Sequence, residues 1–338
     1  MTATVDIVIL NYNTRGLLEK LLPNVIANCK YPGVQIVVAD NASSDGSADF
    51  VASNFSQIEV IRMSENRGYA GGYNECLKHR TADYFLLLNS DAVPRKNWLE
   101  PLLELATKNP KLGAAQPHIY DYYQPNKFEY AGAAGGFIDS FGFPFCRGRI
   151  FGNVETDKGQ YRDSRPVFWA TGAALFISRK AWNEANGLDP TFFAHMEEID
   201  LCWRLQNMGY EIWSCADSGV DHMGGGTLSN LSPRKTYLNF RNSLLMLHKN
   251  LPANKKERVL LARKLFDGLA GVFFLLQGRP AHIPQIIKAH RDFSKLRKTI
   301  TPGKNNKNAN QLTGVLHASL VLNYFFKGRK TWSKLGLP

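Results

Sequence analysis

The stretch ADYFLLLNSDAVP, residues 82–94, sets the pattern from which the fold can be read. Its apolar run, residues 84–88, predicts a buried β-strand that leads directly into Asn89, Ser90 and Asp91. A strand this apolar that ends in a carboxylate indicates a ligand site at its end. The alternative is an aspartate that caps a helix or a turn before the proline that closes the stretch.

The same pattern of apolar run and helical segment repeats along the first 120 residues. Strands are predicted at residues 5–13, 34–41, 58–63, 83–89 and 112–120, and helices at 14–29, 43–55, 69–80 and 97–108. Strands that alternate with helices over short connections predict an α/β fold with a Rossmann-like, mostly parallel central sheet and flanking helices. Because ligands bind at the carboxyl ends of such strands, Asn11, Tyr12, Asp40 and Asp91 are expected at one edge.

Composition places the chain among globular proteins. Its 338 residues are 44% hydrophobic and 12% aromatic, enough for a sizeable core. Five cysteines without a C-x-x-C pair indicate reduced thiols and a cytoplasmic protein, not a disulfide framework or a zinc site. The first ten residues lack the basic region of a signal peptide, and no apolar run reaches the length of a membrane-spanning helix.

Two further segments carry candidate chemistry. Residues 65–74, ENRGYAGGYN, place glycines at a helix start, where backbone N–H groups could hold a phosphate; tight packing explains such glycines equally well. Residues 192–210 predict a helix whose first turn holds three acids, which the helix dipole favours. Asp200 lies four residues before Arg204, which predicts a surface ion pair. Glu198 lies over an apolar stripe, where a raised pKa would suit a general base.

Taken in order, the motifs form a specific series. They are NYN, ADNASSDGS, NRGYAGGYN, LLNSDA, WATGAALFISR, MEEIDLCWRL and DHMGGGT. This series resembles the inverting nucleotide-sugar glycosyltransferases of family 2, which have the GT-A fold. Within that family it is most similar to the rhamnosyltransferase-like branch, over residues 4–250.

The resemblance implies binding roles for matching positions. Nucleotide binding is implied for Asn11, Tyr12, Asp40, Asn66, Gly68, Asn89 and Ser90. Acceptor or sugar binding is implied for Glu197, Asp200, Trp169, Thr171 and Gly172.

The resemblance also implies a metal site and a catalytic base. Asp91 matches the last acid of the family's D-x-D motif, and His222 matches a histidine that completes the metal site in some relatives; Mn²⁺ or Mg²⁺ is the implied ion. Asn89 stands where the motif has its first acid. Glu198 matches the catalytic base, where the family usually has aspartate, so its two acidic neighbours stay open as alternatives. A lone histidine such as His222 is also commonly structural.

The implied activity is metal-dependent, inverting transfer of a sugar from a nucleotide-diphosphate sugar, dTDP-rhamnose or a UDP-sugar. The acceptor would be a hydroxyl of a glycan or a lipid-linked molecule in cell-surface polysaccharide assembly. Residues 1–250 would form the catalytic domain, with a nucleotide-binding half at 1–118 and an acceptor half at 119–250. The alternatives are a nucleotidyltransferase, or a non-catalytic, membrane-associated protein that binds nucleotide sugars.

The last hundred residues differ in charge from the rest. Residues 234–338 contain 21 Lys and Arg against three acids, a net +18, which leaves −6 on the preceding 233 residues. Apolar helices predicted at 265–276 and 315–326 are flanked by basic residues, so 251–338 is expected to be a basic helical region. Such helices suit the surface of an anionic membrane, and peripheral attachment at its inner face is expected; packing as ordinary core is the alternative. Nucleic acid is not expected as a partner, because aromatic residues are not interleaved with the basic ones.

Overall fold

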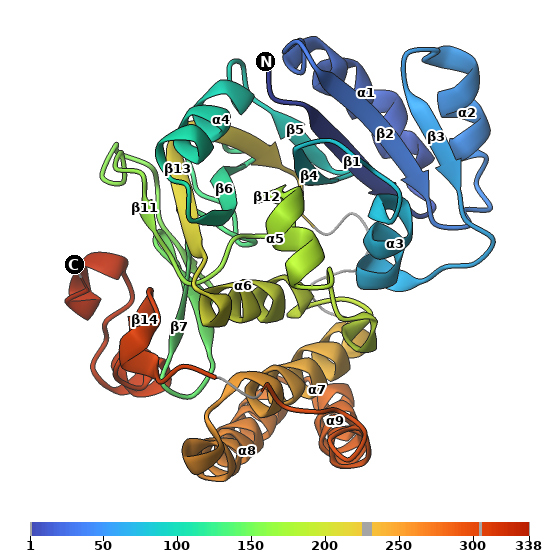
Figure 1. The fold of residues 1–338 in the computed structure, drawn as a ribbon. Helices are drawn as coiled ribbons and strands as arrows, with labels where there is room; N and C mark the ends of the chain where they lie inside the picture. The colour runs from blue at the N-terminus through green and yellow to red at the C-terminus, as the bar shows by residue number, and fades with distance from the viewer. Residues whose placement is uncertain (1, 225–231, 304–305, 338) are drawn as a thin grey trace.

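A computed structural model describes residues 2–224, 232–303 and 306–337. Four parallel strands form one half of its central sheet, in the order β3, β2, β1, β4 (Figure 1). Their bounds are β1 Val5–Asn11, β2 Val34–Asp40, β3 Glu59–Arg62 and β4 Tyr84–Asn89. The predicted strands of this half are confirmed. The apolar runs of β1 and β4 are buried on both faces, as in parallel sheets, whereas β3 at the edge is partly exposed.

Helices cover both faces of this half. In β1, Val5, Ile7 and Ile9 face one core and Val8 faces the other, since side chains of a strand alternate. The first core packs against α1 Arg15–Asn28, α2 Ser47–Asn54 and α4 Leu99–Lys108. The second packs against α3 Gly68–Leu77, α5 Arg179–Glu184 and α6 Glu197–Met208. The α/β class predicted from the sequence is therefore confirmed.

Beyond β4 the sheet becomes mixed. Strand β12, Ala174–Ser178, pairs antiparallel with β4 on one side and with β6, Leu112–Asp121, on the other. Strand β13, Glu211–His222, then runs parallel to β6 and pairs antiparallel with β5, Ala92–Pro94, and β11, Arg165–Pro166. These partners lie far apart in the sequence, so local periodicity does not reveal their order.

A second, smaller sheet takes four of its five strands from the region between β6 and β11 and the fifth from near the C-terminus. Its strands are β7 Gly136–Asp139, β8 Pro144–Cys146, β9 Arg149–Ile150, β10 Asn153–Val154 and β14 Val315–Leu316. The helix predicted at 315–326 is therefore wrong in its first part: β14 pairs parallel with β7, and a helical turn follows only at Leu322–Phe326. The edge of β7 offers backbone hydrogen bonds that an isolated helix would leave unused.

Three helices form a layer below the sheets (Figure 1). They are α7 Pro233–Asn250, α8 Ala253–Leu276 and α9 Ile283–Leu296. Short 3-10 turns lie at Pro190–Phe192, Pro280–His282, Ala309–Gln311 and Trp332–Leu335. Helix α7 packs against α6, α8 and α9. Within the described residues, no helix combines the length and apolar character needed to cross a membrane.

The C-terminal segment packs against the smaller sheet. The ring of Trp332 is 5% exposed, and its centroid lies 4.2 Å from that of Phe137 and 6.0 Å from that of Phe145. The backbone N–H of Leu320 donates to the buried carboxylate of Asp139 in β7. Residues more than 170 positions apart thus stabilise one another.

We expect Trp332→Ala to lower the free energy of unfolding by about 3–5 kcal/mol, because the ring leaves a cavity between β7 and β8. Urea denaturation measures the loss. The matched control is Ser333→Ala at the exposed neighbouring position, which should change stability by less than about 0.5 kcal/mol. Equal effects of the two substitutions would contradict the packing described here.

Candidate active site

A cavity of about 800 Å³ opens at the carboxyl ends of β1 and β4. Its walls come from the loop after β1, the start of α3, the loop before β12, the start of α6, and α7 and α8. Twelve of the fifteen predicted site residues line it: Tyr12, Asn66, Gly68, Asn89, Ser90, Asp91, Trp169, Thr171, Gly172, Glu197, Glu198 and His222. The edge of the sheet predicted as a ligand site is thus the floor of a real cavity.

Strand pairing brings Asp91 and His222 together. Strand β5 follows Asp91 directly and pairs with β13 so that Ala92 lies opposite His222. The carboxylate Oδ1 of Asp91 lies 3.0 Å from Nε2 of His222, and both residues are buried. These two positions, 131 residues apart, were predicted to form one site.

The sequence analysis missed Glu129, which holds the other side of the His222 ring. Its Oε2 lies 3.0 Å from Nδ1 of His222. Burial alone would lower the pKa of His222, but its hydrogen bonds to Asp91 and Glu129 outweigh burial and raise that pKa to about 10. Glu129 lies in the irregular stretch after β6, where no local pattern distinguishes it. It fixes the orientation of the ring, as carboxylates do behind metal-binding histidines.

The donor set at this point fits a divalent cation. Asp91 supplies carboxylate oxygen, and His222 supplies imidazole nitrogen once a cation displaces the proton from Nε2, since a ligating imidazole is neutral. This combination suits Mn²⁺ and, less strongly, Mg²⁺. Within the described residues, no cluster of three or more His, Cys, Asp or Glu side chains is arranged to hold a metal by itself. A cation here would therefore rely on oxygens from outside the protein, such as those of a diphosphate.

The start of α6 places two adjacent carboxylates in the cavity wall. Within the part of the chain that the structure describes, Oε2 of Glu197 and Oε2 of Glu198 are buried without a hydrogen-bond partner. Burial raises the pKa of Glu198 to about 7, although backbone N–H groups at the helix start oppose it. Burial and the neighbouring Glu198 raise the pKa of Glu197 well above its ordinary value. Two such carboxylates do not ionise together easily, so one holds a proton when the other is charged.

The loop before α6 has a strained backbone. Phe193, His195 and Met196 have φ angles of 65°, 70° and 73°, in the left-handed region that residues other than glycine rarely adopt. Strain of this kind costs about 1–3 kcal/mol per residue and persists only where the surroundings enforce it. The loop leads directly into Glu197 and Glu198, so its conformation sets where the two carboxylates lie.

Asn242 of α7 enforces this conformation. Its side-chain Nδ2 lies 2.9, 2.9 and 2.7 Å from the backbone carbonyl oxygens of Phe192, Ala194 and His195. Asn242 is fully buried, so these carbonyls replace water as its acceptors. We call this contact the Asn242 clamp.

The loop is held from the other side by the start of α3. The backbone N–H of Tyr69 donates to the carbonyl of Phe193 at 2.7 Å. Gly68 has a φ of 68°, and a Cβ there would lie 2.6 Å from the same carbonyl oxygen. Only glycine permits this approach, so Gly68 positions the loop in addition to lining the cavity.

Asp200 lies elsewhere, which corrects its predicted role at the acceptor. It is fully buried and does not line the cavity. Its Oδ2 accepts hydrogen bonds from Arg204 and Lys249, each at 2.8 Å, and its Oδ1 accepts one from Asn250. The ion pair with Arg204 is confirmed, but it is buried and not on the surface. Asp200 joins α6 to α7, and its oxygens are engaged there.

Asn11 and Asp40 lie beneath the cavity rim instead of on it. Nδ2 of Asn11 donates to Oδ1 of Asp40 at 2.8 Å, and both side chains are buried. Oδ2 of Asp40 accepts from the backbone N–H of Ser43, which shapes the loop after β2. Asn41, which the sequence analysis passed over, is on the rim, where its Nδ2 donates to Oδ1 of Asn66.

Aromatic and basic side chains line the opposite end of the cavity. Trp169 is anchored there by a hydrogen bond from Nε1 to the carbonyl of Phe137. The hydroxyl of Tyr69 donates to the carbonyl of Gly172 at 2.6 Å and so ties the two walls together. Further lining residues are Phe143, Arg149, Phe151, Arg263, Phe274, Arg279 and His282. The cavity therefore runs from the rim beside β1 to the end of α8.

Comparison with known proteins identifies the family. The model of the family described as "Glycosyl transferase family 2" matches residues 6–184. The chain is 25% identical over 228 residues, 62% of its length and 73% of the relative's, to an N-acetylglucosaminyl-diphospho-decaprenol L-rhamnosyltransferase of Mycobacterium tuberculosis. It is 25% identical over 253 residues, 72% of its length and 76% of the relative's, to a low-salt glycan biosynthesis hexosyltransferase of Haloferax volcanii.

Solved structures share the fold at low sequence identity. S. aureus TarS in complex with UDP-GlcNAc is 15% identical, with a TM-score of 0.57 over 86% of this chain and 80% of that chain. A mannosyltransferase from Pyrobaculum calidifontis in complex with GDP-Man and Mn²⁺ is 16% identical, with a TM-score of 0.54 over 88% of this chain and 79% of that chain. The fold is that of the GT-A glycosyltransferases. The chain belongs to glycosyl transferase family 2, and within it to the rhamnosyltransferase-like type.

We expect Asn242→Ala to lower the rate of sugar transfer about a hundredfold, because the released loop no longer holds the carboxylates in place. The pH profile should also shift to lower pH, since a more exposed Glu198 has a pKa nearer the ordinary 4.5. Transfer assays over a range of pH measure both effects. The same change at the exposed Asn254 is the control, and an unshifted pH profile in Asn242→Ala would contradict the role of the clamp.

Proposed function

We propose that this protein moves a sugar from a nucleotide-diphosphate sugar to a hydroxyl of a glycan or lipid-linked acceptor, with inversion at the anomeric carbon. The observation that carries the proposal is Glu198, a carboxylate with one unpartnered oxygen and a pKa near 7, in the same cavity as the Asp91–His222 pair. A general base works best when its pKa lies near the working pH. The other residues that line the cavity fit binding of the donor, the cation and the acceptor.

The donor would occupy the end of the cavity beside β1. Tyr12 and Asn66 reach this rim. Solved structures of similar fold hold GDP-Man and UDP-GlcNAc, which gives the precedent for a nucleoside diphosphate. Asn11 and Asp40 would support the nucleoside from beneath, through the loop after β2. The name of the Mycobacterium tuberculosis relative favours dTDP-rhamnose as donor, and the TarS complex keeps UDP-sugars as the second choice.

Asp91 and His222 would hold Mn²⁺ or Mg²⁺ at the diphosphate, with Glu129 orienting the histidine ring. When bound, the cation supplies positive charge that stabilises the leaving nucleoside diphosphate. Asn89 and Ser90, at the end of β4, would contact the donor beside it. With asparagine at the first position of the motif, the protein offers fewer carboxylates than a full D-x-D, and so a modest metal affinity is proposed.

Glu198 would remove the proton from the attacking acceptor hydroxyl. Glu197, whose pKa is raised by burial and by the neighbouring Glu198, would hydrogen-bond to hydroxyls of the sugar or the acceptor. Trp169, Thr171 and Gly172 would line the acceptor's path into the cavity. One displacement, with the base on the face opposite the leaving group, gives inversion.

The proposed setting is the cytoplasm, at the inner face of the membrane, in the assembly of cell-surface polysaccharide. All five cysteines are buried and free, in agreement with a reducing compartment. The name of the Mycobacterium tuberculosis relative points to an acceptor linked through diphosphate to a polyprenol.

The direct test is transfer by the purified full chain from a panel of nucleotide sugars to a prenyl-diphosphate-linked sugar. Release of nucleoside diphosphate and formation of a product with the inverted anomeric configuration, measured by NMR, are expected. Retention of configuration would overturn the inverting mechanism. Release of pyrophosphate from a sugar phosphate and a nucleoside triphosphate would instead favour the nucleotidyltransferase alternative.

We expect Glu198→Gln to lower kcat by about two to four orders of magnitude with little change in donor affinity. Because the base must be charged, kcat/KM of the unchanged protein should rise about tenfold per pH unit below pH 7 and level off above it. Steady-state kinetics from pH 5 to about 9 measure both. If Glu197→Gln gives the large loss and Glu198→Gln does not, the roles of the two residues are reversed.

The raised pKa of Glu198 also has a consequence for stability. The folded protein holds the proton more tightly than the unfolded chain, so stability falls as pH rises from 4.5 to about 7. We expect Glu198→Gln to be more stable than the unchanged protein at pH 8, by on the order of 2–3 kcal/mol, and equally stable at pH 4. Thermal denaturation at the two pH values tests this, and a difference of the same size at both would contradict it.

We expect Asp91→Asn, or treatment with a chelator, to abolish transfer while the protein stays folded, because the cation loses its carboxylate ligand. Added Mn²⁺ should restore the chelated protein more fully than Mg²⁺. Asp217→Asn at an exposed position is the control. Full activity in the presence of a chelator would contradict the proposed metal dependence.

A further inference from the structure

Helix α8 carries its apolar side chains on the outside. Leu261, Leu265, Leu269, Val272 and Leu276 are spaced so that they share one face, and each is between 56% and 80% exposed. A helix on the surface of a water-soluble domain normally turns this face to the core. Apolar surface on this scale marks a site of contact with another molecule.

The inward face of α8 is mixed: Leu260 joins the main core and Phe266 packs against Phe143, but a buried ion pair lies between them. Arg263 is buried and donates to Oδ1 of Asp267 and to the carbonyl of Gly142. Oδ2 of Asp267 lies 2.9 Å from Nε2 of His290 in α9. These contacts all lie on the side of α8 that faces the protein, so the fold does not use the outer apolar face.

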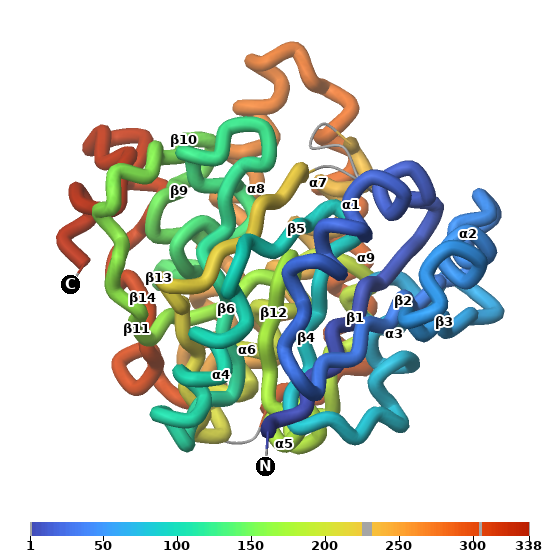
Figure 2. Tube along the Cα trace, turned by 90° about the horizontal axis from the view of Figure 1, so that it is seen from above, coloured from blue at the N-terminus to red at the C-terminus, as the bar shows by residue number. Residues whose placement is uncertain are grey.

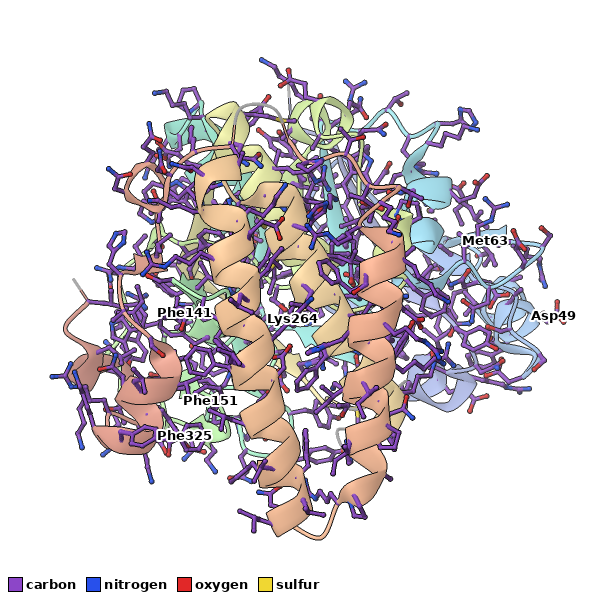
Figure 3. The ribbon with its side chains drawn as sticks, turned by 90° about the horizontal axis from the view of Figure 1, so that it is seen from below. Asp49, Met63, Phe141, Phe151, Lys264 and Phe325 are labelled. Atoms are coloured by element: carbon purple, nitrogen blue, oxygen red, sulfur yellow. The ribbon has the colours of Figure 1, made fainter. Side chains whose placement is uncertain are left out.

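The apolar surface continues beyond α8. The rings of Phe273 and Phe325 lie 6.0 Å apart, and Phe326 beside them is 80% exposed. Ile287 of α9 is also exposed. Figure 3 looks onto this face, with α8 and α9 side by side in front and Phe325 beside α8. In Figure 2 the end of α8 and the start of α9 project beyond the rest of the chain.

Basic residues predominate around this apolar surface, and the exposed Glu257, one turn before Leu261, is paired with Arg297. Exposed basic residues around it are Arg279, Lys288, Arg291, Lys327, Arg329 and Lys330. Residues 258–338 contain fifteen Lys and Arg and two acids, Asp267 and Asp292. Asp267 is the buried partner of Arg263, and Asp292 accepts a hydrogen bond from the hydroxyl of Tyr237. Neither acid offsets the positive charge of the surface.

The same surface borders the acceptor end of the cavity. Arg263 and Phe274 of α8, with Arg279 and His282 of the turn that follows, line that end. An acceptor molecule held in a layer that covers α8 could therefore reach the cavity while it stays in that layer.

We propose that the outer face of α8, with residues 273–287 and 322–330, lies on an anionic lipid bilayer and opens the acceptor end of the cavity toward the lipid headgroups. The apolar stripe enters the interface and the surrounding cations contact phosphate headgroups, as in helices that lie along a membrane. A second copy of the chain fits less well, because it would bring two positively charged faces together. The proposal rests on the proposed function only for the identity of the acceptor.

Co-sedimentation of the full chain with lipid vesicles tests the proposal. Vesicles of phosphatidylglycerol and phosphatidylcholine should retain the protein at low salt and retain less at high salt, whereas phosphatidylcholine alone should retain little. The triple variant Leu269→Ser, Leu276→Ser and Phe326→Ser should reduce binding at least about fivefold, because apolar insertion is lost. These side chains are so exposed that the thermal midpoint should not fall.

The matched control is Tyr123→Ser with Met208→Ser, which removes exposed apolar side chains outside this surface. It should bind anionic vesicles as the unchanged protein does. Equal binding by the triple variant, or no binding of the full chain at low salt, would overturn the proposal. So would light scattering that shows a dimer which the triple variant dissociates, since a second copy would then cover the face.

Transfer to a short-chain acceptor in free solution separates this proposal from the proposed function. The triple variant should keep that activity, because none of its three positions lines the cavity. Vesicle binding without any sugar transfer would overturn the proposed function and leave the membrane surface standing. Full transfer in solution without vesicle binding would overturn the membrane surface and leave the proposed function standing.

Discussion

The active site depends on one buried amide. Asn242 has no water to bond with, and the carbonyls of Phe192, Ala194 and His195 accept its hydrogen bonds only while the loop before α6 keeps its left-handed conformation. The strain in that loop is local, but the force that maintains it comes from α7, some fifty residues further along the chain. Asp200 strengthens the same junction through Lys249, so the helix that carries Glu198 is fixed at both its start and its inner face.

The site also shows how a fold accepts unfavourable groups where chemistry requires them. A buried carboxylate without a full set of partners opposes folding at neutral pH, and α6 begins with two. Asp91, His222 and Glu129 show the opposite arrangement. Each ring nitrogen of His222 has a carboxylate partner, Asp91 on one side and Glu129 on the other. The first arrangement fits the proposed base, and the second would orient the proposed metal ligands.

The sequence predicts the parallel half of the sheet, because the apolar periodicity of each strand and helix there is visible within about ten residues. It predicts Asp91 and His222 through the order of the motifs. Glu129 and Asn242 escape prediction, since each acts on a segment about fifty to ninety residues away and sits in no local pattern. Asp200 shows the converse, because helical spacing groups it with Glu197 and Glu198 but does not reveal that α7 presents Lys249 to it. The sequence of residues 315–326 predicts a helix, because nothing in that segment indicates that the edge of β7 is free to pair with it.

The pairing of β14 with β7 sets an order in time as well as in space. Strands β1 to β4 pair with one another within the first 89 residues, so this parallel part of the sheet can begin to form while the chain is still being synthesised. The smaller sheet cannot take in its last strand until residues 315–316 have left the ribosome, some 176 positions after β7. Loss of the last few dozen residues, by a premature stop or by proteolysis, would therefore leave the parallel part of the central sheet with its strands and the smaller sheet without β14.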